Sequence, residues 1–187
     1  MTTLLAFDTA AAHCAAALLL QGRVVTRVDA MARGQAEHLM PMLEEVLTAE
    51  GLHWRDLDGI GVGIGPGNFT GIRISVAAAR GLALGLGKPA IGVSTFDAQA
   101  YGRSGATIVL PAPRDQVYVQ RADDAPQFLR AEEAPAGAPL KDTSTMIADL
   151  AQVAASRLGT PQPRPAPLYM RPADAAPPKE AAPVILG

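Results

Sequence analysis

GIGVGIGPGNFTGIR, at residues 59–73, passes from a strand pattern directly into the start of a helix. Its first half alternates glycine with branched apolar residues, which is the period of two that a β-strand requires. The bare glycines on one face of such a strand allow another backbone or a helix to approach closely. We therefore predict a strand over residues 59–65 whose glycine face packs against a neighbouring element.

The loop after this strand is rich in turn-forming residues. Gly65, Pro66 and Gly67 favour a tight turn, and the hydroxyl of Thr70 is a candidate cap for a helix that begins near Ile72. Free amides at such a helix start are suited to an anion, but the lysine and following Ser or Thr of a Walker-type loop are missing. Three interpretations stay open: a structural turn, a phosphate-binding loop and a partner-binding loop.

Composition places the chain among ordinary globular proteins. It has 187 residues, 49% of them apolar, and a net charge of -2, so it lacks the basic excess typical of nucleic-acid binders. Cys14 is the single cysteine, which excludes an internal disulfide and indicates a reducing compartment. The apolar N-terminal segment lacks a basic start, and we expect no segment long enough to span a membrane. These features predict a cytoplasmic protein without membrane contact.

The remaining patterns predict two lobes, over residues 1–100 and 101–187. In the first lobe we expect a meander of three antiparallel strands at residues 4–7, 14–20 and 23–29. A helix at 39–50, a strand at 59–65, a helix at 72–86, a strand at 90–93 and a short helix after Ser94 follow. Pro41 either kinks the first helix or marks its start. In the second lobe we expect strands at 107–110 and 116–121, a helix at 143–157, and a proline- and alanine-rich tail that is extended or partly disordered rather than packed.

Several motifs resemble those of the TsaB (YeaZ) family, accessory proteins of bacterial tRNA threonylcarbamoyladenosine modification within the glycoprotease (M22-like) and actin-like ATPase superfamily. The matching pieces are LLAFDT at 4–9, HLMPM at 38–42, the run from Gly63 through Gly71 to Arg73, GVST at 92–95, Val117-Tyr118, and LYMR at 168–171. The similarity is dense over residues 3–100 and sparse afterwards.

This resemblance implies an α/β actin-like ATPase (RNase H-like) fold, with mixed central sheets in both lobes and a reduced second lobe. It implies a non-catalytic scaffold that binds the transferase subunit TsaD and works with the ATPase TsaE, so that ATP and magnesium belong to the partners and tRNA is met only through the complex. The partner surface, which also serves a homodimer of the isolated protein, maps onto the first two helices at Leu39, Met42, Leu43, Val46, Ile72, Val76, Ala79 and Arg80.

The sequence itself argues against catalysis by this chain alone. A metal site on the first helix needs two histidines one turn apart, but Gly34 and Met42 occupy those positions around His38, so we expect no metal. By resemblance to actin-like ATPases, the residues nearest a phosphate are Asp8, Thr9, Gly65, Gly67, Asn68, Thr70 and Gly71. The second acidic position of such ATPases is lost in the segment that carries Pro111, Pro113 and Gln116. An actin-fold phosphotransferase and a glycoprotease-like metallopeptidase remain as alternatives, and both are disfavoured.

Overall fold

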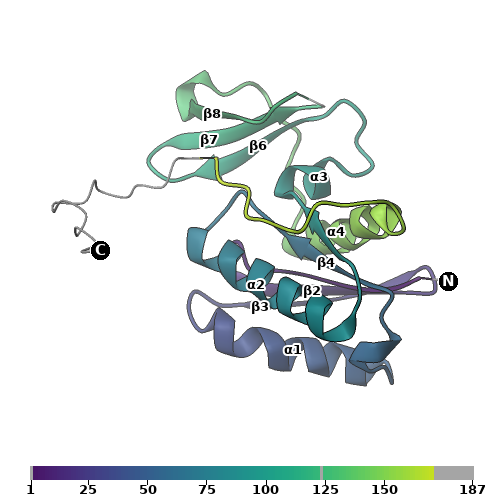
Figure 1. Ribbon diagram of the computed structural model, residues 1–187. Helices are drawn as coiled ribbons and strands as arrows, with labels where there is room; N and C mark the ends of the chain where they lie inside the picture. Colours follow the sequence, from purple (N-terminus) through teal and green to yellow (C-terminus); the bar gives the residue numbers. More distant parts are fainter. Residues whose placement is uncertain (1, 123, 171–187) are drawn as a thin grey trace, which may run out of the picture.

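The computed structural model describes residues 2–122 and 124–170, and its larger sheet has five strands in the order β3-β2-β1-β4-β5 (Figure 1). The meander is confirmed: β1 (Thr3–Asp8), β2 (His13–Leu20) and β3 (Arg23–Ala30) pair antiparallel. The turn between β2 and β3 places Gln21 and Gly22 at positive φ angles of 52° and 85°. β4 (Gly59–Gly63) and β5 (Ala90–Val93) continue the sheet parallel to β1.

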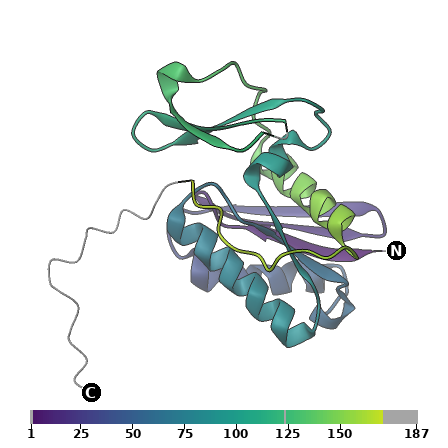
Figure 2. The same cartoon turned by 45° about the horizontal axis from the view of Figure 1, so that its top comes forward.

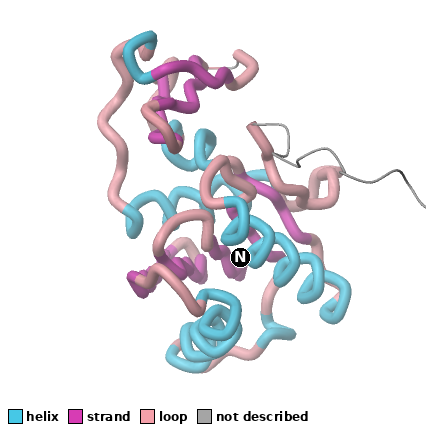
Figure 3. Tube along the Cα trace, turned by 90° about the vertical axis from the view of Figure 1, so that its left-hand side faces the viewer, coloured by secondary structure: helices cyan, strands magenta, loops and turns pink. Residues whose placement is uncertain are grey.

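Both faces of this sheet are covered by helices. α1 (Gln35–Ala49) and α2 (Phe69–Leu86) lie on one face, and α4 (Thr143–Arg157) lies on the other (Figures 1 and 3). Leu5 and Phe7 point into the core beneath α1 and α2, whereas Leu4 and Ala6 point into the core beneath α4. This two-sided burial explains why β1 and β2 read as nearly continuous apolar runs.

The helix α1 contains Pro41 in its interior instead of starting at it. The helix begins six residues before the proline and ends at Ala49, and Gly51 follows with a φ of 70°. The apolar stripe of α1 is buried against the sheet, as the periodicity predicted. α2 begins one turn earlier than predicted, at Phe69 rather than Ile72.

The glycine face of β4 is where α4 packs. A Cβ added to Gly61 would lie 2.9 Å from the Cβ of Ala154, and one added to Gly59 would lie 2.7 Å from a methyl group of Leu158. The predicted close approach is therefore confirmed. The assignment of α4 to the second lobe is wrong, because its apolar side, with Ile147 and Leu150, is buried in the core of the five-stranded sheet.

The second sheet is small and has the order β6-β7-β8. β6 (Thr107–Ala112) and β7 (Gln116–Arg121) were predicted, and β8 (Gln127–Arg130) was not. This sheet packs on α3 (Thr95–Ala100) through Phe96, and Ser94 caps that helix by accepting a hydrogen bond from the Asp97 amide. Two single turns of 3-10 helix, η1 (Trp54–Asp56) and η2 (Ala131–Glu133), complete the described elements.

The segment after α4 is extended and returns across the molecule towards the start of α2 (Figure 2). The Leu168 amide donates to the carbonyl of Ile64 at 2.8 Å, and Arg73 Nε donates to the Tyr169 hydroxyl at 2.7 Å. Residues 161–169 form neither helix nor strand, but the prediction that this segment is not packed is wrong, because Pro165 is buried and Leu168 packs against the core of the second sheet. Residues 171–187, which include Arg171 of the LYMR motif, lie outside the described residues.

One of the described helices, α2, is long and apolar enough to cross a membrane by length and composition alone, contrary to our expectation that no segment reaches that length. Core helices of soluble proteins pass the same test. In this structure α2 lies flat on the sheet, with Ile72, Val76 and Ala79 buried beneath it.

Candidate functional site

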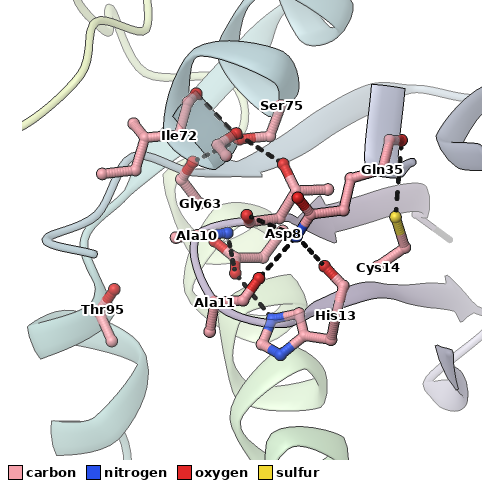
Figure 4. Close-up of polar contacts among 12 residues, drawn as sticks. Asp8, Ala10, Ala11, His13, Cys14, Gln35, Gly63, Ile72, Ser75 and Thr95 are labelled. Carbon is pink, nitrogen blue, oxygen red and sulfur yellow. Dashed lines mark hydrogen bonds and ion pairs between the residues drawn. The ribbon is translucent and has the colours of Figure 1, made fainter. Parts of the chain in front are cut away.

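Asp8 ends β1 at the edge where the glycine-rich loop begins, and it is 3% exposed (Figure 4). Its Oδ1 accepts a hydrogen bond from the Ala10 amide at 2.9 Å and lies 3.0 Å from Nε2 of His13. His13 is therefore paired with this carboxylate. The pair closes the loop between β1 and β2 on itself.

Gln35, the first residue of α1, holds the same loop from the other side (Figure 4). Its side-chain amide donates to the carbonyls of Ala11 at 2.7 Å and His13 at 3.1 Å. The Thr9 hydroxyl donates to the carbonyl of Gly71 at 2.7 Å. Residues 8–13 are therefore fixed between the starts of α1 and α2.

The glycine-rich loop packs directly on this segment. A Cβ on Gly63 would lie 1.8 Å from Asp8 Oδ2, one on Gly67 2.5 Å from the Ala10 carbonyl oxygen, and one on Gly71 1.9 Å from the Thr9 carbonyl oxygen. No side chain fits at these distances, so each glycine is required by the neighbouring backbone or carboxylate. Of the interpretations left open for the loop, the structural turn accounts for these three positions.

Asn68, not Thr70, caps α2. Asn68 Oδ1 accepts from the Gly71 amide at 2.9 Å, while Thr70 is exposed within the first turn. Asn68 is the cap because the helix starts at Phe69, and the Asn68 side chain is then within reach of the third helical amide. Gly65 has a φ of 91°, and its carbonyl accepts from the Thr95 amide at 2.8 Å. The candidate phosphate-proximal residues thus lie together, and within this set Thr9 and Asn68 each bond to Gly71.

Over residues 2–122 and 124–170, no group of three or more His, Cys, Asp or Glu side chains is arranged to hold a metal ion. His38, the histidine of the predicted first helix, lies 2.7 Å from Asp29 Oδ2 through its Nε2. The hydrogen bond from Arg27 and then that from His38 hold the pKa of the Asp29 carboxyl below its ordinary value. This cluster ties β3 to α1.

The proposed partner residues need a correction. Leu39, Met42, Leu43, Val46, Ile72, Val76 and Ala79 are at most 6% exposed and form the core between the helices and the sheet. An amphipathic helix on a sheet buries its apolar stripe beneath it, so this stripe is not available to a second protein. Of the eight predicted residues only Arg80 is exposed, and it points away from the space between the two helices.

The outer surface of the same helices carries a groove that sequence reasoning missed. Its volume is about 910 Å³, and it runs between α1, η1 and α2. We call it the helical groove; it is lined by Met40, His53, Trp54, Arg55, Asp56, Ala78, Gly81, Leu82, Gly85 and Leu86. The small residues of α2 were the signal for it, because Gly81 and Gly85 have no atom within 4 Å of an added Cβ.

The comparisons with known proteins agree on one family. A protein-family model described as TsaD, tRNA N6-adenosine threonylcarbamoyltransferase, matches residues 29–155, more than half of the chain. The tRNA threonylcarbamoyladenosine biosynthesis protein TsaB of Escherichia coli K12 is 41% identical over 112 residues, which are 58% of this chain and 48% of that protein. TsaB of Haemophilus influenzae is 38% identical over 98 residues, 52% of this chain and 42% of that protein. The chain thus spans about half the length of the curated relatives it matches.

Solved structures confirm the fold. YeaZ from Pseudomonas aeruginosa superimposes with a TM-score of 0.75 at 27% identity, covering 90% of this chain and all of that chain. A Pseudomonas aeruginosa protein described as similar to peptidase YEAZ gives a TM-score of 0.76, also at 27% identity, over 91% of this chain and all of that one. The structure is therefore the mixed α/β, actin-like (RNase H-like) fold that the motifs predicted.

Proposed function

Because the chain belongs to the TsaD protein family and is similar to TsaB (YeaZ) proteins, we propose that it is a non-catalytic scaffold that activates a TsaD subunit in tRNA threonylcarbamoyladenosine modification. In this proposal TsaD transfers the threonylcarbamoyl group, and TsaE is the ATPase of the assembly. ATP and magnesium act in those partners, and tRNA is bound through the complex. In this proposal the protein acts in the cytoplasm, where tRNA is modified.

The observation that carries the proposal is the helical groove. Met40 is 38% exposed at its rim, and Leu82 and Leu86 are only partly covered inside it. A contiguous exposed apolar surface of this kind often marks a protein-binding site. The groove also has a rigid wall, because Trp54 of η1 donates a hydrogen bond to Glu44 of α1.

The small residues of α2 indicate that the groove can accommodate a helix of a partner. Gly81 and Gly85 lie one helical turn apart and leave open space above the helix backbone. A helix of a partner can approach such a surface more closely than one covered by large side chains. We therefore propose that TsaD docks a helix along α2 and α1, and that a second copy of this chain takes its place when TsaD is absent.

The test is co-purification of the chain with TsaD from the same organism, followed by size-exclusion chromatography with light scattering. We expect a one-to-one complex for the wild type. Met40→Glu places a charge at the rim of the groove and should abolish the complex without unfolding the chain, since this side chain is exposed. Leu140→Glu is the matched control, because Leu140 is 45% exposed and lies in a loop away from the groove.

The buried residues Leu39 and Val76 are unsuitable for this test, since a charge at either would unfold the chain whether or not it binds TsaD. A complex that survives Met40→Glu unchanged would refute docking at the groove. ATP turnover by the isolated chain that disappears in Asp8→Ala would replace the scaffold proposal with a phosphotransferase.

A further inference from the structure

A second cavity, of about 600 Å³, lies where the second half of α2, strand β5 and the extended segment after α4 meet. We call it the arginine cavity, because Arg80 of α2, Arg157 in the last turn of α4 and Arg164 of the extended segment all line it. No carboxylate lines this cavity among the described residues. The three guanidinium groups come from parts of the chain far apart in sequence, so only the fold brings them together.

One of these three charges is already compensated. Arg157 lies 3.0 Å from Asp97 Oδ2 and donates to the carbonyl of Gly92 at 3.2 Å. Arg80 and Arg164 are exposed, and neither has an ion pair or side-chain hydrogen bond with any residue in 2–122 or 124–170. Two unpaired arginines that line one cavity leave uncompensated positive charge there, which an anion can neutralise.

The type of anion follows from the donors and the walls. Guanidinium groups bind phosphate through two parallel hydrogen bonds, which is why arginine is enriched where phosphates are recognised. The rest of the wall is mostly apolar and includes Pro89 and Leu84, of which Leu84 is 85% exposed. A volume of 600 Å³ falls within the usual range for small-molecule sites, about 300–1,000 Å³.

The floor of the cavity is held by polar contacts in the extended segment. The Thr160 hydroxyl donates to the carbonyl of Arg157 at 2.7 Å and accepts from the side-chain amide of Gln162 at 2.8 Å. These bonds hold the segment up to Gln162 against the end of α4, and Arg164 follows two residues later.

We propose that the arginine cavity binds a small phosphorylated molecule of nucleotide size, with its phosphates on Arg80 and Arg164 and its remaining part against Leu84 and Pro89. This site differs from the helical groove and does not depend on the docking of TsaD. It also gives Arg80 a role other than the partner contact predicted from the sequence.

Isothermal titration calorimetry of the full chain with ADP, pyrophosphate and adenosine tests the proposal. We expect ADP to bind, pyrophosphate to bind more weakly, and adenosine not to bind at millimolar concentration. Arg80→Gln and Arg164→Gln should each raise the dissociation constant for ADP about tenfold, because each removes a charged donor. Arg121→Gln is the control, since Arg121 is exposed on the second sheet and has no side-chain partner among the described residues.

Thermal unfolding of each variant verifies that the chain remains folded. The proposal is overturned if ADP and pyrophosphate both fail to bind, if adenosine binds as well as ADP, or if the double variant binds ADP like the wild type. Binding of an RNA oligonucleotide without binding of ADP or pyrophosphate also overturns it. Co-purification of Arg164→Gln with TsaD is measured separately, and we expect it to be unchanged.

Discussion

Gly71 shows how a single missing side chain decides the geometry around Asp8. Its Cα faces the Thr9 carbonyl, and its own carbonyl accepts from the Thr9 hydroxyl at 2.7 Å. The start of α2 therefore lies on the loop that follows β1. Glycine at this position is required by the neighbouring backbone of the chain itself.

Gly71→Ala should lower the free energy of unfolding by about 1–3 kcal/mol, because the added methyl group must displace the Thr9 carbonyl. Gly81→Ala is the matched control in the same helix. It has no atom within 4 Å of an added Cβ, so the gain in helix propensity should raise stability by up to about 1 kcal/mol. Chemical denaturation of both variants checks the prediction, and equal effects of the same sign would contradict it.

Cys14 is fully buried between β2 and α1, where its Sγ lies 3.5 Å from Met31 Sδ. Burial, and then the nearby carboxylates Asp29 and Asp8, raise the pKa of the Cys14 thiol to about 11. The thiolate is the reactive form, so alkylation of the native chain at pH 8 should be at least about 100-fold slower than that of an unfolded cysteine. Mass spectrometry after iodoacetamide treatment measures this, and rapid labelling of the folded chain would show that the core opens.

At the level of elements, the main contact is that of α4 with the glycine face of β4. The β4 pattern predicted that something would pack there, but α4 lies more than eighty residues later in the chain. The pairing is between small residues on both elements, Gly61 and Ala154, so the helix lies unusually close to the sheet. The extended segment after α4 then reaches the end of β4, where the Leu168 amide donates to the carbonyl of Ile64.

Asp29 links β3 to α1, and its contribution to stability should depend on pH. Its folded pKa lies below the ordinary value of 3.8, so the stabilisation is present above about pH 4 and is lost as the pH falls through the folded pKa. Asp29→Asn should therefore cost about 1 kcal/mol at pH 7, and the difference from wild type should shrink in acid.

Urea unfolding of the wild type and Asp29→Asn at pH 7 and at pH 3 measures this dependence. Asp124→Asn serves as the control, since Asp124 is exposed and its side chain has no partner among the described residues. A difference between wild type and Asp29→Asn that grows in acid would contradict the assignment of the shift to Arg27 and His38.

At the level of the whole molecule, the two cavities lie on different surfaces that share α2. The helical groove faces α1 and η1, and the arginine cavity faces β5 and the extended segment. Both contain Gly81 in their lining, so the small residues in the second half of α2 open the surface in two directions. A protein partner and a small anion can therefore occupy this chain through separate contacts.

We expect the isolated chain to form a homodimer through the helical groove. Gly81→Leu fills the groove and should shift the chain towards the monomer without lowering its melting temperature, because the added side chain projects into open space. Ala36→Leu, on the exposed first turn of α1, should leave the dimer unchanged. Light scattering at micromolar concentration distinguishes the two, and a wild-type monomer would show that the groove does not self-associate.

Local sequence patterns predicted the elements whose signals span only a few residues. The alternation in β4, the apolar stripe of α1, and the short helix after Ser94 each depend on residues within a few positions of one another, and each is confirmed. β8 was missed because its four residues include only two apolar ones, Phe128 and Leu129, which is too few to show a period.

Which face of each element is free depends on tertiary packing, which the local patterns do not show. Periodicity identified the apolar stripe at Leu39 and Val46, but such a stripe is equally compatible with a core and with a partner surface. In the structure the sheet beneath α1 buries it. The pairing of Asp8 with His13 depends on the backbone turn between β1 and β2. The placement of Arg80 and Arg164 on one cavity depends on the segment after α4, which returns the chain across the molecule. No local sequence pattern encodes this second, long-range arrangement.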